Sequence, residues 1–163
     1  MDLSKLTSGV ISLTKEVGEF IRKESLVFER EQVEYKGLHD MVSYVDKTAE
    51  IALVKGLRLL LPEAGFVTEE KTTTITGEKY DWIIDPLDGT TNFIHGLPTY
   101  SISIALQCDN ELILGVVYEI NRDECFSAWK NGGAYLNSKR ISVSKASRIE
   151  NTLLATGFPY YEF

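Results

Sequence analysis

Residues 80–93 contain an apolar run that passes directly into a turn rich in carboxylates: Tyr80-Asp81-Trp82-Ile83-Ile84-Asp85-Pro86-Leu87-Asp88-Gly89-Thr90-Thr91-Asn92-Phe93. The apolar part predicts a strand that is covered on both faces. Pro86 has no main-chain N–H, so it is expected to end the strand, and Gly89 to relax the backbone beyond the turn. Asp85 and Asp88 would therefore lie together at one strand end.

Two carboxylates at such a turn repel each other unless one is protonated or a cation lies between them. Hard divalent cations such as Mg2+ prefer oxygen ligands of this kind. Thr90 and Thr91 are expected to cap a short helix over residues 91–95, whose free N–H groups and positive dipole end would face the carboxylates. The stretch predicts an anion site beside a metal site, although a capped turn without a ligand explains the same residue types.

The bulk composition is that of one globular domain, with 163 residues, of which 44% are hydrophobic and 25% charged. A formal net charge of -7 without a Lys/Arg-rich run argues against nucleic-acid and anionic-membrane partners and leaves small ligands. We expect a cytoplasmic protein, because neither a signal peptide nor a membrane-spanning apolar run is present. Cys108 and Cys125 are predicted to be buried free thiols.

The first part of the chain predicts one long helix. Apolar residues recur at spacings of three and four from Leu3 to Phe20 and continue through Ile21 to Phe28, as on the buried face of a helix. A polar connection with Gly37 as its hinge is expected over residues 34–40.

A second helix is predicted to begin after Ser43 and to end before Pro62. Ser43 at the N-cap and Asp46 at the third helical position resemble a capping box in which Asp replaces Glu. Capping alone would explain Asp46. His39 and His95 are expected to be surface or capping residues, since neither has a partner at metal-binding spacing.

Residues 65–70 predict a short strand that ends in Glu69 and Glu70. If this strand neighbours the one before Asp85, Glu69 lies beside Asp85 and Asp88. A loop or hairpin over residues 71–79 would connect the two. Short turns between the later apolar runs predict antiparallel pairing. These runs are residues 100–106, 112–120, 125–129 and 134–136, with 141–143 and 153–156 as further candidates.

Three motifs follow one another in a recognisable order: Asp40-Met41-Val42-Ser43-x-x-Asp46, Thr68-Glu69-Glu70, and Asp85-Pro86-Leu87-Asp88-Gly89-Thr90-Thr91-Asn92-Phe93. This order resembles the inositol monophosphatase family of Mg2+-dependent, lithium-sensitive phosphatases. The resemblance extends over essentially the whole chain and includes residues 115–118 and 132–135. The third motif is highly specific to the family.

The resemblance implies a set of metal ligands. Glu69, Asp85 and the main-chain carbonyl of Leu87 would bind a first Mg2+, and Asp85 and Asp88 a second. Glu70 would contact these ligands without binding the metal itself. An oxygen-only set of this kind suits Mg2+, which binds one or two carboxylates, substrate phosphate and water.

The resemblance also implies how substrate is held and attacked. The main-chain N–H groups of Gly89 and Thr90 would receive the phosphate, with Asp88 and Glu69 also in contact with substrate. Asp46 and the Thr90 hydroxyl would orient the attacking water and help to remove its proton, with Glu69 completing the catalytic set. A looser match places Lys36 in the mobile loop of the family.

The fold implied is α+β, the layered α/β fold of sugar phosphatases, whose N-terminal half packs two long helices on an antiparallel sheet. Residues 1–163 would be the N-terminal metal-binding domain, and the C-terminal domain of the family, with its Trp-Asp-x-Ala-Ala-Gly-type motif, is expected to be absent from this chain.

The implied function is Mg2+-dependent hydrolysis of a small phosphate monoester, myo-inositol monophosphate first, by a homodimer. Residues 91–93 favour the inositol branch. Alternative substrates are 3'-phosphoadenosine 5'-phosphate and fructose 1,6-bisphosphate. A truncated, non-catalytic metal-binding module and a purely structural dimerisation domain remain open as alternatives.

Overall fold

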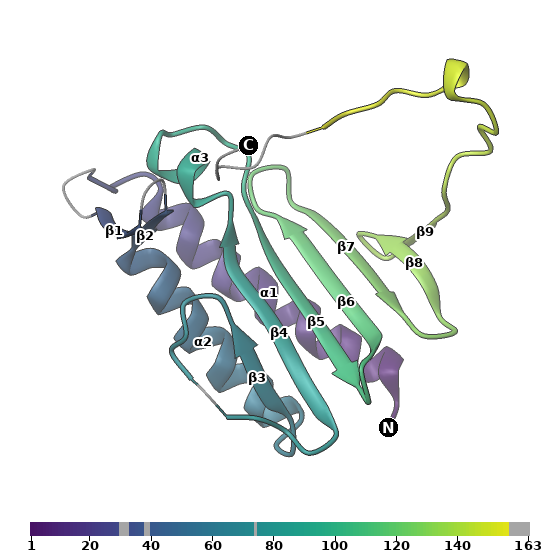
Figure 1. The fold of residues 1–163 in the computed structure, drawn as a ribbon, viewed down its shortest axis with the longest axis horizontal. Helices are drawn as coiled ribbons and strands as arrows, with labels where there is room; N and C mark the ends of the chain where they lie inside the picture. The colour runs from purple at the N-terminus through teal and green to yellow at the C-terminus, as the bar shows by residue number, and fades with distance from the viewer. Residues whose placement is uncertain (30–32, 38–39, 74, 157–163) are drawn as a thin grey trace.

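The computed structural model describes residues 1–29, 33–37, 40–73 and 75–156. Two long helices cross one face of a seven-stranded sheet, and a two-stranded sheet and a short helix lie at one end (Figure 1). The helical elements are α1 (Leu3–Glu24), α2 (Tyr44–Leu60), α3 (Thr90–Ile94) and the 3-10 turn η2 (Ile149–Asn151). The strands are β1 (Val33–Gly37), β2 (Asp40–Ser43), β3 (Gly65–Thr68), β4 (Tyr80–Asp88), β5 (Ser101–Cys108), β6 (Glu111–Glu119), β7 (Glu124–Trp129), β8 (Gly133–Leu136) and β9 (Lys139–Ile141).

The large sheet has the strand order β3-β4-β5-β6-β7-β8-β9, so strands that follow one another along the chain are also neighbours. All pairs are antiparallel except β3 and β4, which run parallel with Thr68 opposite Ile84. The hairpin alternative for residues 71–79 is therefore wrong. A parallel partner requires the chain to return to the starting end of β3 before β4 begins.

Helix α1 confirms the long helix that the apolar periodicity predicted from Leu3 onwards. Asp2 caps it by accepting a hydrogen bond from the N–H of Lys5 at 3.1 Å, and its apolar stripe is buried against α2 and the sheet. The helix ends at Glu24, before Phe28. Phe28 still packs in the core, because its ring meets that of Phe93 edge-on at 5.0 Å.

The prediction of a polar loop over residues 34–40 is wrong. The described residues of this segment belong to β1 and β2, an antiparallel pair with an irregular register between Tyr35 and Gly37. The alternation of Val33 and Tyr35 with charged residues is compatible with a strand, and the polar composition concealed it. His39 lies outside the described residues.

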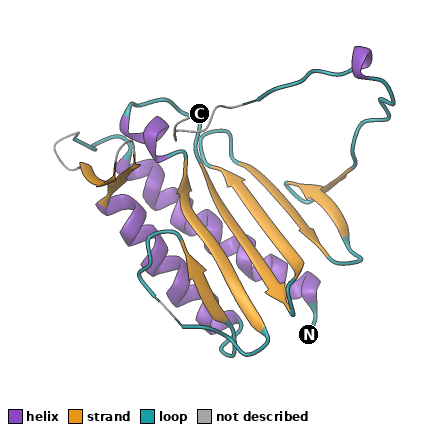
Figure 2. Cartoon of the chain, viewed as in Figure 1, coloured by secondary structure: helices purple, strands orange, loops and turns teal. Residues whose placement is uncertain are grey.

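Strand β4 differs from prediction in two respects. Trp82 and Ile84 are buried but Ile83 is only half-buried, because the helices cover one face of the sheet (Figure 2). Pro86 also does not end the strand, which continues to Asp88. The pairing with β5 shifts between Asp85 and Asp88, and a residue without an N–H is tolerated at such an irregularity.

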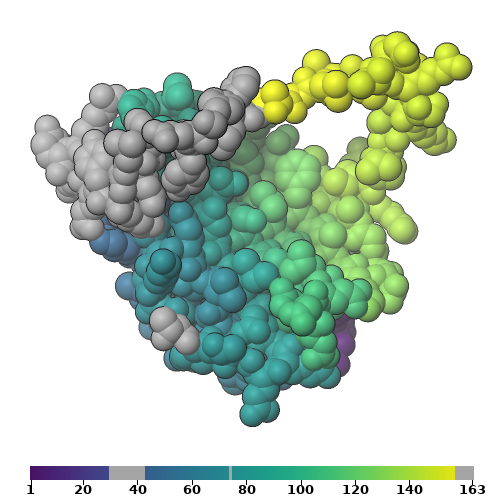
Figure 3. Space-filling view, in the orientation of Figure 1, coloured from purple at the N-terminus to yellow at the C-terminus, as the bar shows by residue number. Residues whose placement is uncertain are grey.

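The segment after β9 is exposed over residues 142–156 and stands clear of the helices and the sheet (Figure 3). Of the expected strand over residues 141–143 only Ile141 belongs to β9, and residues 153–156 form no strand. Leu153 is 96% exposed, so it does not pack against the sheet. Apolar composition alone misled the prediction here.

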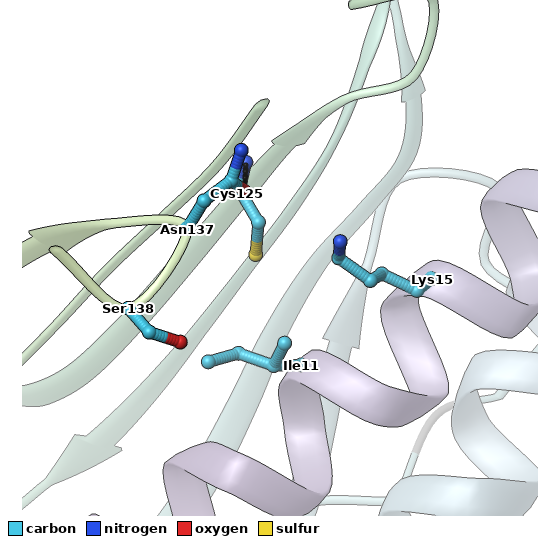
Figure 4. Close-up of a pocket in the computed structure, with 5 residues that line it drawn as sticks. All are labelled: Ile11, Lys15, Cys125, Asn137 and Ser138. Atoms are coloured by element: carbon cyan, nitrogen blue, oxygen red, sulfur yellow. Dashed lines mark hydrogen bonds between the residues drawn. The ribbon is translucent and has the colours of Figure 1, made fainter. Parts of the chain in front are cut away.

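Both cysteines are free, as predicted, but only Cys125 is buried, whereas Cys108 is half-buried. Burial raises the pKa of the Cys125 thiol. The thiol faces a cavity of about 140 Å3 between α1 and the β7–β8 region, towards which Lys15 also points (Figure 4). Among the described helices, none has the length and apolar character needed to cross a membrane.

Candidate active site

Strand β3 lies beside β4 and runs parallel to it, and β4 continues past the end of β3 towards α3 (Figure 1). Because the strands are parallel and Thr68 is opposite Ile84, Glu69, the first residue after β3, lies level with Asp85 in β4. The N–H of Glu69 continues the pairing by donating to the Ile84 carbonyl at 3.2 Å. The expected position of Glu69 required these two strands to be neighbours, and the structure confirms that they are.

Asp85 is the half-buried carboxylate of this group, whereas Glu69 and Asp88 are exposed. Burial, and then the negative charge of Asp88, raise the pKa of Asp85 to about 6, with Asp46 and Glu70 adding to the effect. The N–H of Leu87, which donates to Asp85 Oδ1 at 3.1 Å, acts in the opposite direction. A bound cation would reduce the repulsion between these negative charges.

Gly89, and not a threonine, precedes helix α3. Its φ of 98° is open to glycine and strained for other residues, and a Cβ there would approach the Thr99 carbonyl oxygen at 3.1 Å. The expectation that Thr90 or Thr91 caps the helix is wrong: Gly89 is the N-cap, without a side-chain cap, and the helix begins at Thr90. The Thr90 side chain is engaged elsewhere.

The hydroxyl of Thr90 connects two parts of the site. Its oxygen lies 2.8 Å from Asp46 Oδ1 and 2.9 Å from the carbonyl oxygen of Leu87. A hydroxyl has one proton, so it donates to one of these acceptors at a time. If the Leu87 carbonyl is used as a ligand, the proton remains available to Asp46.

Asp46 is fully buried, and both of its carboxylate oxygens accept hydrogen bonds. Its Oδ2 accepts from the N–H of Ser43 at 2.9 Å and from the Ser43 hydroxyl at 2.6 Å, which completes the predicted capping box of α2. Its Oδ1 faces Thr90. Capping holds the carboxylate rigidly and leaves one oxygen directed at the turn after β4.

Sequence reasoning missed Glu50, a fully buried carboxylate of α2. It accepts hydrogen bonds from the N–H groups of Glu70 and Thr72, at 2.7 and 2.8 Å. Its place one helical turn after Asp46 is the signal that could have found it, because residues four apart share a helix face. Glu70 is thus held through its main chain.

No described contact joins Lys36 or His95 to this site. Lys36 belongs to β1, and its side chain lies outside the described residues. His95 is exposed, and its Nδ1 lies 2.8 Å from the Thr91 carbonyl oxygen, as expected of a surface residue at a helix end.

The carboxylates at this turn are the candidate ligands for a metal ion. Among the residues that the structure describes, no three His, Cys, Asp or Glu side chains form a group that could hold one. Mg2+ does not require such a group, since it binds one or two carboxylates and completes its shell with other oxygens and water. Glu69, Asp85 and Asp88, with the Leu87 carbonyl, fit that requirement in chemical type.

The chain belongs to the inositol monophosphatase family, whose model matches residues 2–162. A protein of Dictyostelium discoideum named inositol monophosphatase is 35% identical over 161 residues, which are 97% of this chain and 59% of that protein. Nus factor SuhB of Haemophilus influenzae is 45% identical over 127 residues, or 77% of this chain and 47% of that protein.

Solved structures agree with the family. The extragenic suppressor protein suhB of Bartonella henselae matches with a TM-score of 0.80 at 36% identity, over 86% of this chain and 55% of that one. An IMPase of Thermotoga maritima matches with a TM-score of 0.75 at 36% identity, over 83% and 52% of the two chains. The chain therefore spans about half the length of the relatives it matches.

Proposed function

We propose that this chain carries the metal- and phosphate-binding constellation of a Mg2+-dependent phosphatase that hydrolyses a small phosphate monoester. The observation that carries the proposal is the pairing of β3 with β4, which brings Glu69 level with Asp85, close to the turn where Thr90 bonds to Asp46. Family membership supports the reaction class.

The proposed metal ligands are Glu69, Asp85 and the Leu87 carbonyl for one Mg2+, and Asp85 and Asp88 for a second. Bound there, Mg2+ would lower the pKa of a water molecule and neutralise charge that develops on the transferred phosphoryl group. The raised pKa of Asp85 supports this assignment, because a cation would offset the repulsion from Asp88.

The chain's own groups would orient the nucleophile and hold the phosphate. The Thr90 hydroxyl would accept a hydrogen bond from the attacking water while it donates to Asp46 Oδ1, so the water proton would pass through Thr90 to a buried carboxylate. The main-chain N–H groups of Gly89 and Thr90 would receive the phosphate, with Asp88 and Glu69 also contacting the substrate.

The proposed substrate is myo-inositol monophosphate. Support comes from the Dictyostelium relative, which is named inositol monophosphatase, and from Thr91-Asn92-Phe93. The substrates to set beside it are 3'-phosphoadenosine 5'-phosphate and fructose 1,6-bisphosphate. A homodimer in the cytoplasm remains the proposed assembly and location.

Phosphate release from inositol 1-phosphate, with and without Mg2+, tests the proposal, with Asp85→Asn as the matched variant. Mg2+-dependent release by the wild type that is lost in the variant is the expected result. A folded chain that binds Mg2+ but releases no phosphate would favour a non-catalytic binding module. A folded chain that binds no Mg2+ would favour a structural dimerisation domain.

A further inference from the structure

Among the described residues, β3 is an edge strand of the large sheet, with β4 on one side; on its outer side the N–H of Phe66 donates to the Ile75 carbonyl at 2.7 Å. Its final pairing contact is the hydrogen bond from the N–H of Glu69 to the Ile84 carbonyl at 3.2 Å. Beyond that point β3 has ended, whereas β4 continues to Asp88. Contacts that another element makes with the segment after β3 therefore help to set the position of Glu69.

Glu50 on α2 supplies such support from the covered face of the sheet. Both of its carboxylate oxygens are used: Oε2 accepts from the N–H of Glu70 at 2.7 Å and Oε1 from the N–H of Thr72 at 2.8 Å. The side chain is fully buried. Hydrogen bonds to a charged acceptor inside a protein are stronger than neutral ones and fix geometry.

Lys71 lies between the two donors with a φ of 56°, a left-handed conformation that costs free energy for a residue other than glycine. Such a conformation persists where the surroundings hold it. The two hydrogen bonds that Glu50 accepts, from the N–H groups on either side of Lys71, hold the turn in this shape.

Glu50 also lies one turn after Asp46 on the same buried face of α2. Asp46 is bonded to Thr90 at the start of α3, and Glu50 to the segment that follows Glu69. Helix α2 thus connects the two parts of the site, each through a buried carboxylate.

We propose that Glu50 is a positioning residue, which holds the Glu69–Glu70 segment so that Glu69 is set for binding of a divalent cation. This role rests on the function proposed above, but it concerns the affinity for Mg2+ and not the chemical step. A merely structural role would lower stability and leave the affinity unchanged.

Glu50→Gln is the sharpest variant, because it preserves shape while replacing one acceptor oxygen with an NH2 group. One of the two main-chain N–H groups then faces a donor. Glu63→Gln makes the same chemical change at an exposed position just before β3 and serves as the control. Calorimetric titration with Mg2+ measures affinity, and amide hydrogen exchange reports on residues 70 and 72.

We expect Glu50→Gln to weaken Mg2+ binding roughly 10-fold to 100-fold, as loss of a group that orients a metal ligand does. The amides of Glu70 and Thr72 should exchange faster in this variant, and Glu63→Gln should match the wild type. Unchanged Mg2+ affinity in Glu50→Gln would overturn the proposal while leaving the proposed function intact.

The wild-type protein provides a test that does not depend on the folding of any variant. Its amides at Glu70 and Thr72 should exchange slowly, unlike those of the exposed residues 142–156. If these two amides exchanged as fast as those of residues 142–156, Glu50 would not fix the position of the segment, and the proposal would be overturned. A folded wild type that binds no Mg2+ would contradict the proposed function itself, and the metal-positioning role with it.

Discussion

At the scale of single residues, the pKa of Asp85 departs clearly from that of the free side chain. Burial and the nearby charge of Asp88 raise its pKa from 3.8 to about 6, so in the metal-free chain its charged form is disfavoured by folding. Between these pKa values the folded chain binds a proton that the unfolded chain has released. Stability conferred by protonated Asp85 is therefore complete at low pH and is lost as the pH rises through about 6.

Asp85→Asn should remove this pH dependence. Relative to the variant, we expect the metal-free wild type to lose about 1 kcal/mol of unfolding free energy as the pH rises from about 4 to about 7, after allowance for solvent screening at a half-buried site. Urea unfolding across that pH range measures the difference. Parallel pH profiles for the two proteins would show that Asp85 is not perturbed.

The sequence predicted Asp46, Glu69, Asp85, Asp88 and Thr90 as site residues because each belongs to a recognisable motif, and the structure places them at the ends of α2, β3 and β4 and the start of α3. It did not reveal Glu50. A glutamate inside a helix usually faces solvent, and only the fold shows that its two acceptor oxygens meet main-chain donors twenty and more positions away.

At the scale of elements, α1 lies so close to the sheet that Gly18 is in contact with Tyr118. A Cβ on Gly18 would come within 2.5 Å of the Tyr118 ring, and the phenol is held by Arg22 and Asp123, at 3.2 and 2.9 Å from its oxygen. Lys15 also bonds to Asp123, at 2.9 Å. The ring cannot move aside without disturbing these contacts.

Gly18→Ala should therefore lower the free energy of unfolding by about 1–2 kcal/mol, because overpacking exceeds the gain in helix propensity. Gly9→Ala is the matched control on the same helix: its Cβ would meet only the flexible end of Leu60, which is 37% exposed. We expect that control to be neutral or slightly stabilising. Urea unfolding of both variants decides, and equal effects would argue against the close approach of α1.

Prediction of the elements succeeded where the signal was local. The capping box at Ser43 and the stop at Pro62 delimit α2 as expected. The parallel pairing of β3 with β4 was not predictable from either strand, since it depends on how the chain returns over residues 69–79. The strand at β1 was missed because polar composition outweighed its alternation.

At the scale of the whole molecule, both helices lie behind one face of the sheet and the candidate site lies at its end (Figures 1 and 2). The half-buried position of Ile83, which was expected to be covered, follows from this one-sided arrangement. The alternation of Ile102, Ile104 and Leu106 with smaller residues along β5 is the local signal of such burial, whereas the helices that cover the face depend on contacts distant along the chain. The α+β class and the two long helices were predicted correctly.

The most direct measurement is a calorimetric Mg2+ titration of the wild type, Asp85→Asn and Asp109→Asn. Asp109 is exposed in the turn after β5 with a φ of 50°, which asparagine tolerates, so this control makes the same chemical change away from the site. We predict Mg2+ binding by the wild type and Asp109→Asn, and loss of binding in Asp85→Asn. Equal binding by all three folded proteins would contradict a metal site at the ends of β3 and β4.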